Sequence, residues 1–592
     1  MPSAPNTNPQ RGLRILGLSG FQREAAAVLI QDGRVVAAAA EERFSHVRRD
    51  ANFPRRAVRY VLREGDLTAR DLDAIVWFEK PLRRFERNLI TTLTAFPGSA
   101  KVFANGMFRW LGDRLWMRNL ICRELLADGE QVHFVLHHEA HAASACLTSP
   151  WAEEGCDFLI LDGAGEWACS AGGRWQAGKP ETLLEVPFPH SLGFFLRAIA
   201  EHLGFDPASD DALVAELAAR GNPATLRDAV GQIVKLGGEG GYRLDASKLR
   251  FRYDSDRWFE ESVSAFFGPI RTPGAPLRAQ PGDSHDADLA AAAMDAVETA
   301  ALTLARNLQK RSGGKRLCLG GDLAQLPRLV ARLLKDGPYA EIHVDPAPSD
   351  SGAALGAAAL AHSLLSQGAP LAWPGQSVGE PNLDDAGDGA QPLATPEAAR
   401  RALVEALAHG RIAGWVRGRF EWGPRALGRR CLFADPRSAD VVERLQREIK
   451  RREEFRPWGC AMPAERAAEF VELPAGAASP ARSKMIALRA RDALRQAAPV
   501  LVAPDGTCVP HLVERATDPE LHALLTEFGA ITGLPVLLTT SLDLRGDPPA
   551  RGEAEARAVL ARSGLDLLVV ENRLYDDAEP TRRATKQAIP AS

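Results

Sequence analysis

The chain has 592 residues, too many for one hydrophobic core, so we expect two to four domains. Its 45% hydrophobic and 25% charged content is ordinary for a globular protein, and a net charge of −4 without a strongly basic block gives no indication of a nucleic-acid partner. No apolar run reaches the roughly 18 residues of a membrane span, and the eight cysteines include no CxxC pair. We therefore expect a cytoplasmic protein with no membrane partner, no disulfide framework and no cysteine zinc site.

The N-terminal part of the sequence predicts strands followed by a helix. Apolar runs at 14–18, 25–30 and 34–40 are typical of strands, and the turn Asp32-Gly33 between the last two predicts a hairpin. A proline then opens a predicted helix over 55–64. We therefore expect the chain to begin with antiparallel strands followed by a helix.

Three histidines follow a short apolar run at 132–136. On a helix, His137 and His141 are four residues apart and point off the same face, which is the geometry that two ligands of one metal ion need. The zinc-protease pattern fails, because it requires a histidine at position 142, where this chain has Ala142. The spacing also fits histidines on a helix surface or in a satisfied core, and it leaves these alternatives open.

Glycine-rich turns follow two of the predicted strands. The run at 158–161 ends in the acidic turn Asp162-Gly163-Ala164-Gly165-Glu166, which could supply a third metal ligand and backbone N–H groups for a phosphate. A strand at 316–319 ends in Gly320-Gly321-Asp322. Both turns are therefore candidates for a ligand site.

Composition divides the chain into two domains. A predicted helix over 353–365 is followed by residues 367–394, which are rich in Gly, Pro, Asp and Gln without periodicity and are typical of a linker. We therefore expect one domain over 1–366 and a second over 395–580. The tail at 581–592 is expected to be disordered.

Five blocks of the sequence carry a resemblance to a known family. They are Glu41-Glu42-Arg43-Phe44, His137-His138-x-x-His141-Ala142, Asp162-Gly163-x-Gly165-Glu166, Asp350-Ser351-Gly352-x-x-x-Gly356-Ala357-Ala358 and Gly423-Pro424-Arg425-Ala426-Leu427-Gly428. Together they resemble the ATP-dependent O-carbamoyltransferases of antibiotic tailoring and nodulation-factor decoration. The last block is the most specific, because its distance to Lys450 and to Arg456-Pro457 also matches.

The resemblance implies an α/β fold in two parts. The N-terminal half is similar to the duplicated actin/sugar-kinase-like domain of tRNA threonylcarbamoyl transferases, and the C-terminal half to the smaller α/β domain that makes the acyl-adenylate in that pathway. The implied reaction moves a carbamoyl group from carbamoyl phosphate, by way of a carbamoyl-adenylate made with ATP and Mg²⁺, to a small natural-product acceptor. The implied metal is Fe²⁺, with Zn²⁺ or another divalent ion as the alternative.

The resemblance also assigns roles to single residues. The metal ligands would be His137, His141, Asp162 and Asp350. Carbamoyl phosphate would be bound by Arg425, Lys450, Arg456 and Ser541, of which Arg425 and Lys450 would also act in catalysis. The nucleotide would lie against Gly163, Gly165, Glu166, Gly320, Gly321 and Asp322.

The sequence departs from the family at positions that carry the chemistry. Where the family has His-Asp after the first strand, this chain has Gln22-Arg23, and Glu24 is the only nearby candidate for the acceptor's base. The family's Asn-Thr-Ser-Phe-Asn ends here in Ser541-Leu542-Asp543.

Three hypotheses therefore stay open. The first is a divergent enzyme with a different acceptor or acyl group. The second is a catalytically weakened homologue that acts as a partner subunit, in a homodimer or with a second homologue. The third is a metallohydrolase that uses only the N-terminal site.

Overall fold

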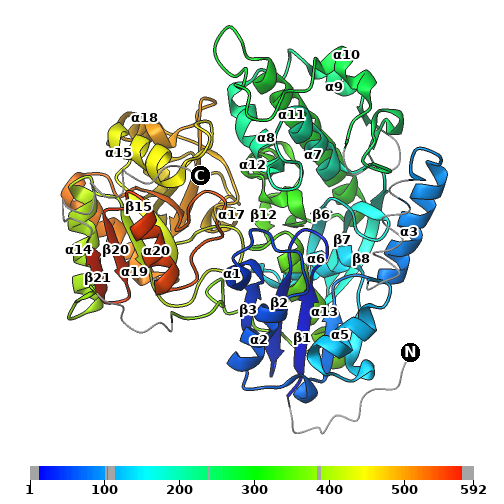
Figure 1. The fold of residues 1–592 in the computed structure, drawn as a ribbon, viewed down its shortest axis with the longest axis horizontal. Helices are drawn as coiled ribbons and strands as arrows, with labels where there is room; N and C mark the ends of the chain where they lie inside the picture. The colour runs from blue at the N-terminus through cyan, green and yellow to red at the C-terminus, as the bar shows by residue number, and fades with distance from the viewer. Residues whose placement is uncertain are drawn as a thin grey trace. The chain divides into compact units, whose positions relative to one another are not determined.

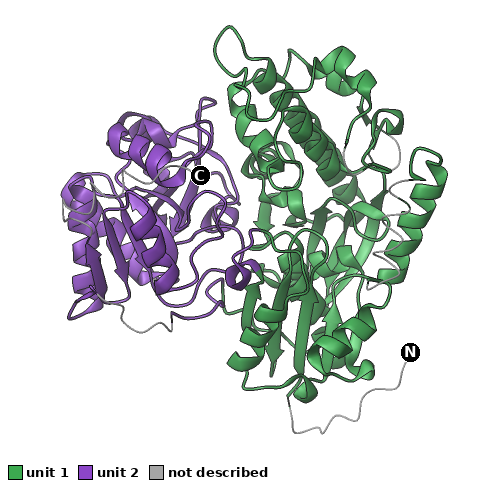
Figure 2. Cartoon of the chain, in the orientation of Figure 1, with its two compact units in different colours: residues 1–41, 49–375 green, residues 42–48, 376–592 purple. Residues whose placement is uncertain are grey.

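The computed structural model describes residues 12–100, 103, 114–237, 241–254, 257–382 and 389–576. The chain divides into two compact units (Figure 2): unit 1 is residues 1–41 and 49–375, and unit 2 is residues 42–48 and 376–592. The division after residue 375 falls inside the predicted linker at 367–394, part of which lies outside the described residues, as does the predicted tail. Independent folding of the two units stays a prediction.

Unit 1 contains two five-stranded mixed sheets with the same connectivity (Figure 1). The orders are β3-β2-β1-β4-β5 and β8-β7-β6-β11-β12. In each sheet the first three strands are antiparallel neighbours, and the last two run parallel to the central strand. This repeat confirms the predicted α/β fold with a duplicated actin/sugar-kinase-like domain.

The strand bounds of the first sheet are β1 Arg14–Ser19, β2 Ala26–Gln31, β3 Arg34–Ala40, β4 Ala74–Trp77 and β5 Val132–Phe134. Those of the second sheet are β6 Cys156–Leu161, β7 Ala168–Gln176, β8 Lys179–Pro187, β11 Arg316–Gly320 and β12 Glu341–Val344. The antiparallel pairing of β2 with β3 confirms the hairpin predicted around Asp32-Gly33.

In unit 1, two helices each pack on the sheet that they do not follow in the chain. Helix α6 (His137–Leu147) follows the first sheet in the chain but packs on β6, β7 and β11 of the second. Helix α13 (Asp350–Leu365) follows the second sheet but packs on β1, β2 and β4 of the first. The two helices also pack on each other, and a Cβ at Gly356 would lie 1.7 Å from the Ala140 carbonyl oxygen, so only glycine permits this approach. The helix pair therefore lies between the two sheets.

Helix α2 packs on β2 and β3 of the first sheet and α11 on β6, β7 and β8 of the second, whereas α7 and α8 pack on α11 (Figure 1). Helix α2 begins and ends at the predicted residues, and the long helix α11 packs on α8 and α12. Their bounds are α2 Arg55–Glu64, α7 Leu192–His202, α8 Asp211–Leu217, α11 His285–Ser312 and α12 Pro327–Asp336. Within the ranges that the structure describes, no helix is both long and apolar enough to cross a membrane.

Unit 2 is built on a nine-stranded sheet in the order β13-β21-β20-β14-β15-β19-β16-β18-β17. Helices α14 (Pro396–Ala408) and α19 (Pro519–Thr532) pack against each other, and their leucines join Trp415 and Phe433 in one buried core. The strand bounds are β13 Gln391–Pro392, β14 Ala413–Val416, β15 Arg430–Ala434, β16 Gly459–Pro463, β17 Leu488–Arg489, β18 Thr507–Val513, β19 Leu537–Ser541, β20 Leu567–Val570 and β21 Arg573–Asp576.

The block Glu41-Glu42-Arg43-Phe44 has a packing role. In unit 1, the Glu41 carboxylate accepts hydrogen bonds from the backbone N–H groups of Arg56 and Ala57, in the first turn of α2. In unit 2, which includes helix α1 (Glu42–Ser45), the Arg43 guanidinium lies 5.3 Å from the centroid of the Phe420 ring. Helix capping and aromatic packing thus account for these residue types.

Candidate functional site

Four predicted metal ligands come together where α6 and α13 meet. The rings of His137 and His141 lie 4.6 Å apart, centroid to centroid. Asp162 follows β6, and its Oδ2 lies 2.9 Å from Nε2 of His137. Asp350 begins α13, and its Oδ1 lies 3.9 Å from Nε2 of His141. The ligand atoms of His137, His141 and Asp162 all lie within 4.8 Å of one another, which is close enough to share one ion.

The donor set fits a divalent transition metal. His141 is fully buried, and its Nε2 has no hydrogen-bond partner among the described residues. A buried imidazole nitrogen without a partner is unfavourable unless something else binds it. Two imidazoles and two carboxylates form a nitrogen and oxygen set that suits iron or zinc. His138 turns elsewhere, because its Nδ1 lies against Gly165, where a Cβ would be 2.6 Å away.

Burial and neighbouring charges shift the pKa values of this cluster in different directions. Burial lowers the pKa of His137, but the hydrogen bond and charge of Asp162 outweigh burial and raise the pKa to about 9. Burial, followed by the charge of His137, lowers the pKa of His141 to about 3. Burial raises the pKa of Asp350 to about 7. The cluster therefore holds positive charge beside Asp162, which a divalent cation would also supply.

The two predicted nucleotide turns touch each other. They follow β6 and β11, which are parallel neighbours, so both turns lie at the same edge of the second sheet. The backbone N–H of Asp322 donates a 3.1 Å hydrogen bond to Oδ1 of Asp162. Gly321 has φ of 83°, and a Cβ there would lie 2.4 Å from the Leu161 carbonyl oxygen. Close packing thus explains this glycine, and contact of the turns with a nucleotide stays a prediction.

Other residues of these turns already have protein partners. The Glu166 carboxylate accepts hydrogen bonds from the backbone N–H groups of His137 and Lys80, at 3.1 Å and 2.8 Å. A Cβ at Gly163 would lie 2.8 Å from the ring of Phe194, and Gly320 packs at the end of β11 on the backbone of α6. Glu166 therefore fixes the first turn of α6.

Arg23 is the centre of a buried ion-pair network. Its guanidinium lies 2.6 Å from Asp211 and 3.0 Å from Asp322, and its side chain is 8% exposed. Arg197 also pairs with Asp322, at 2.8 Å. The backbone N–H of Arg23 donates to Oδ2 of Asp350 at 2.8 Å. Arg23, which replaces the family's aspartate, thus holds Asp350 of the candidate metal site through its backbone N–H. The sequence did not reveal this role.

The candidate base Glu24 is held at the start of α13. Its Oε2 accepts 2.6 Å hydrogen bonds from the hydroxyls of Ser349 and Ser351. The neighbouring Gln22 donates a 2.5 Å hydrogen bond to Glu79. The structure therefore explains how Glu24 is positioned, and its role as a base stays a prediction.

In unit 2, Lys450 and Ser541, two of the residues expected to bind carbamoyl phosphate, lie in contact, and their role as ligands stays a prediction. Lys450 ends a π-helical turn (Leu445–Lys450) that continues helix α15 (Ala439–Arg444). Its Nζ donates to the Ser541 carbonyl at 3.0 Å and forms an ion pair with Asp543. Burial lowers the pKa of Lys450, the Asp543 carboxylate opposes this, and the charge of Arg456 adds to the lowering.

A second buried lysine, Lys484, was missed by sequence reasoning. Its Nζ donates to Thr539 Oγ1 at 2.5 Å and to the Ala426 carbonyl at 2.7 Å. In the part of the chain that the structure describes, no carboxylate forms an ion pair with it. Burial lowers the pKa of Lys484, and the nearby charge of Arg425 lowers it further. No motif marks Lys484 in the sequence, because it reaches this site only through the fold.

The loop that carries Arg425 is fixed by a buried carboxylate. Oε1 of Glu421 accepts hydrogen bonds from the backbone N–H groups of Leu427, Arg429 and Arg430, at 3.0, 2.6 and 3.1 Å. Thr539 and Ser541 are two apart on β19, so their side chains project from the same side of the strand. The two lysines thus reach neighbouring positions of one strand, with Arg425 beside Lys484 and Arg456 beside Lys450.

Comparison with known proteins assigns both halves of the chain. Residues 14–359 match the family model described as carbamoyltransferase N-terminus, and residues 404–576 match the model described as carbamoyltransferase C-terminus. The Synechocystis protein sll1178 is 30% identical over 606 residues, which cover 96% of this chain and 97% of that protein. Nodulation protein NolNO of Sinorhizobium fredii is 30% identical over 570 residues, which cover 94% of this chain and 79% of that protein.

Two further matches cover smaller parts of the chain. The 3'-hydroxymethylcephem-O-carbamoyltransferase of Amycolatopsis lactamdurans is 31% identical over 247 residues, which cover 41% of this chain and 45% of that protein. Component A of (R)-2-hydroxyglutaryl-CoA dehydratase from Acidaminococcus fermentans aligns with 60% of this chain and 99% of its own, at a TM-score of 0.33 and 15% identity. The two family models together account for most of both units, and the chain therefore belongs to the carbamoyltransferase family.

Proposed function

We propose that this chain uses ATP to activate carbamoyl phosphate in unit 2 and transfers the carbamoyl group to a small-molecule acceptor at unit 1. The observation that carries the proposal is Lys484, a buried lysine that forms an ion pair with no carboxylate of the described residues and lies near the charge of Arg425. A buried ammonium of this kind is unfavourable unless an anion accompanies it. A phosphate-containing substrate would supply that anion.

The reaction balances without a further co-reactant except water. Water releases inorganic phosphate from carbamoyl phosphate, and an oxygen of the resulting carbamate bonds to the α-phosphorus of ATP while pyrophosphate leaves. The acceptor oxygen or nitrogen then bonds to the carbamoyl carbon, AMP leaves, and the acceptor's proton passes to a base. In unit 2, Lys484, Arg425, Lys450 and Arg456 would hold the anionic groups and disperse the charge of the leaving phosphates.

In unit 1, His137, His141, Asp162 and Asp350 would hold a divalent ion, Fe²⁺ or Zn²⁺, which as a Lewis acid would polarise a carbonyl or phosphate oxygen. Glu24 is the carboxylate proposed to accept the acceptor's proton. Hydroxyls of two serines already donate to its Oε2, so an acceptor's proton would have to compete with them. An amine or an acidic hydroxyl is therefore the acceptor class that this site suits best.

A catalytically weakened partner subunit is the second candidate function, and one observation favours it. Asp543 forms an ion pair with Lys450, so a carboxylate competes there with any incoming phosphate. In the family pattern an uncharged asparagine has this place. A subunit that only supports a second homologue would tolerate such competition.

The proposal is tested by the affinity for carbamoyl phosphate, measured by isothermal titration calorimetry. Lys484→Met keeps the length of the side chain and removes the charge, and we expect it to weaken binding at least tenfold. Lys335→Met, a substitution of an exposed lysine on α12, is the matched control and should bind as the wild type does. Equal affinities of wild type and Lys484→Met would remove the main support for the proposal.

A further inference from the structure

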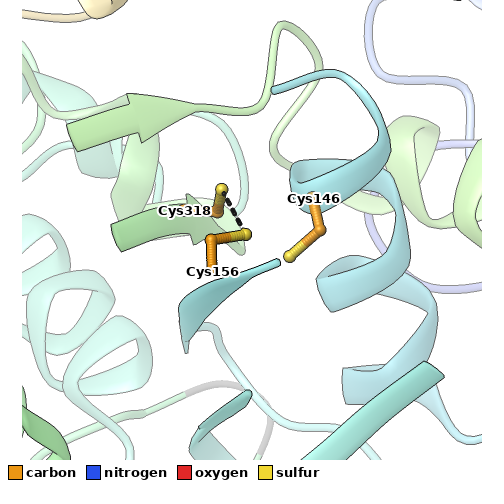
Figure 3. A group of neighbouring side chains, drawn as sticks. All are labelled: Cys146, Cys156 and Cys318. Carbon is orange, nitrogen blue, oxygen red and sulfur yellow. Dashed lines mark hydrogen bonds between the residues drawn. The ribbon is translucent and has the colours of Figure 1, made fainter. Parts of the chain in front are cut away.

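Three cysteines of unit 1 form a cluster that their spacing in the sequence did not predict. Cys146 lies near the end of α6, Cys156 begins β6, and Cys318 lies on β11. Their sulfur atoms all lie within 4.8 Å of one another, and those of Cys156 and Cys318 are 3.4 Å apart. Figure 3 shows these two sulfurs turned toward each other, with Cys146 facing them from the helix. The absence of a CxxC pair led us to expect no cysteine zinc site, but the fold brings these three cysteines together from segments far apart in the chain.

The strand register argues against a disulfide between the close pair. Cys318 lies opposite Phe158 on the neighbouring parallel strand, and Cys156 is two residues before Phe158. With a strand spacing of about 4.8 Å and a rise of about 3.3 Å per residue, the two Cα atoms are about 8 Å apart. An unstrained disulfide needs Cα atoms within about 7 Å. The two free thiols are instead in hydrogen-bond contact at 3.4 Å, which leaves both sulfurs available to bind an ion.

A metal ion has the right size to bridge them. Three sulfurs at about 2.3 Å from one ion lie about 4 Å from one another in a trigonal site, which is within the spread observed here. Thiolates prefer soft, thiophilic ions such as Cu⁺ and Zn²⁺. His343 lies opposite Cys318 on β12, but among the described residues the group of ligand atoms within 4.8 Å of one another contains only the three cysteines.

We propose that Cys146, Cys156 and Cys318 bind one soft, thiophilic metal ion through three thiolates, at a site separate from the histidine and aspartate cluster. An ion there would tie the end of α6 to β6 and β11. It would thereby fix the helix that carries His137 and His141 against the second sheet. The proposal does not depend on the proposed transferase reaction.

The site also has a route for the ion. Cys156 is only partly buried and lines an open pocket of about 480 Å³ that includes Arg316, Lys315 and Arg174. Cys146 and Cys318 are fully buried behind it. Arg316 is paired with Glu154 and Glu341, which also line the pocket, so the pocket carries both signs of charge.

The test titrates the reduced full-length chain anaerobically with Cd²⁺, a soft divalent probe in place of Zn²⁺, and separately with Cu⁺. Absorbance from thiolate-to-metal charge transfer is the readout, because ligation by histidine and aspartate does not give this band. We expect the band to saturate at one ion per chain with at least one of the two probes. The probe that binds then shows whether the site takes a divalent or a monovalent ion.

Cys318→Ala should abolish the band, whereas Cys169→Ala should leave it unchanged. Cys169 is the matched control, because it is also fully buried in the same sheet but lies outside the cluster. As a measurement that needs no variant, the bound ion should protect Cys156 of the wild type from alkylation by iodoacetamide, detected by mass spectrometry. Three results would overturn the proposal. The first is an absorbance band of equal size in both variants, and the second is a rate of Cys156 alkylation that neither ion lowers. The third is a Cys156–Cys318 disulfide in a chain that binds neither Cd²⁺ nor Cu⁺.

Discussion

Replacing Arg23 by methionine removes the guanidinium that two buried carboxylates share. Asp211 and Asp322 would remain buried. Asp211 would keep Arg197 at 3.8 Å and Arg49 at 3.7 Å, and Asp322 would keep Arg197 at 2.8 Å. Removing one partner of a buried ion pair costs about 3 to 5 kcal/mol, and because Arg197 stays 2.8 Å from Asp322 we expect the lower end, about 3 kcal/mol.

Arg55→Met is the matched control. Arg55 contacts Glu124 at 2.6 Å, the same distance as the Arg23–Asp211 contact, but the Arg55 side chain is 57% exposed. An exposed pair of this kind contributes at most about 1 kcal/mol. The two variants therefore compare equal geometries that differ in burial.

The loss should depend on pH in a defined direction. Burial alone would raise the pKa of Asp211, but the charge of Arg23 outweighs burial and holds the pKa below its usual range. The stabilisation is then fully present above about pH 4 and is lost as the pH falls further. Equilibrium urea unfolding, followed by far-UV circular dichroism at pH 7 and below pH 4, measures both effects. If Arg23→Met costs no more than Arg55→Met at pH 7, the buried network does not stabilise unit 1.

Further predictions concern both units. Burial raises the pKa of Asp345 to about 6, so its ionisation destabilises the fold as the pH rises from about 4 to 6. In urea unfolding, Asp345→Asn should therefore raise the free energy of unfolding by about 2 to 3 kcal/mol at pH 7 and leave it unchanged at pH 4. An equal increase at both pH values would contradict this. Asp543→Asn should tighten carbamoyl phosphate binding about tenfold in calorimetry, about 1.4 kcal/mol, because it removes the competing carboxylate; weaker binding would contradict the role of Lys450. After anaerobic iron supplementation, elemental analysis should find one transition-metal ion per chain fewer in the His137→Ala, His141→Ala double variant than in the wild type, and equal metal contents would refute the site. Limited proteolysis should cut within 367–394 first, and earlier cutting at 286–366 would contradict the domain boundary.

Local patterns predicted the elements whose causes are local. The turn Asp32-Gly33 between two apolar runs specifies a hairpin, and the proline before Arg55 marks the start of α2. The four-residue spacing of His137 and His141 sufficed to place both rings on one face of α6. These features depend on backbone geometry within a few residues, which a single sequence carries.

Features that depend on distant contacts were not accessible in this way. Lys484 reaches Thr539 across 55 residues, and Arg23 reaches Asp322 across 299. The cysteine cluster exists because α6 packs on the second sheet, although the helix follows the first sheet in the chain. A family resemblance transfers motif residues, but it does not reveal the partners that have changed around them, such as Arg23 and Asp543.

The most direct test of the central claim is isotope exchange between pyrophosphate and ATP by the purified chain alone, with Mg²⁺ present. If unit 2 makes carbamoyl-adenylate, exchange should require carbamoyl phosphate, and Arg425→Ala should abolish it. The same exchange should survive in Glu24→Gln, because Glu24 is assigned only to the later transfer step. Absence of exchange from the wild-type chain, together with its appearance only when a second homologue is added, would contradict the account and identify the chain as a partner subunit.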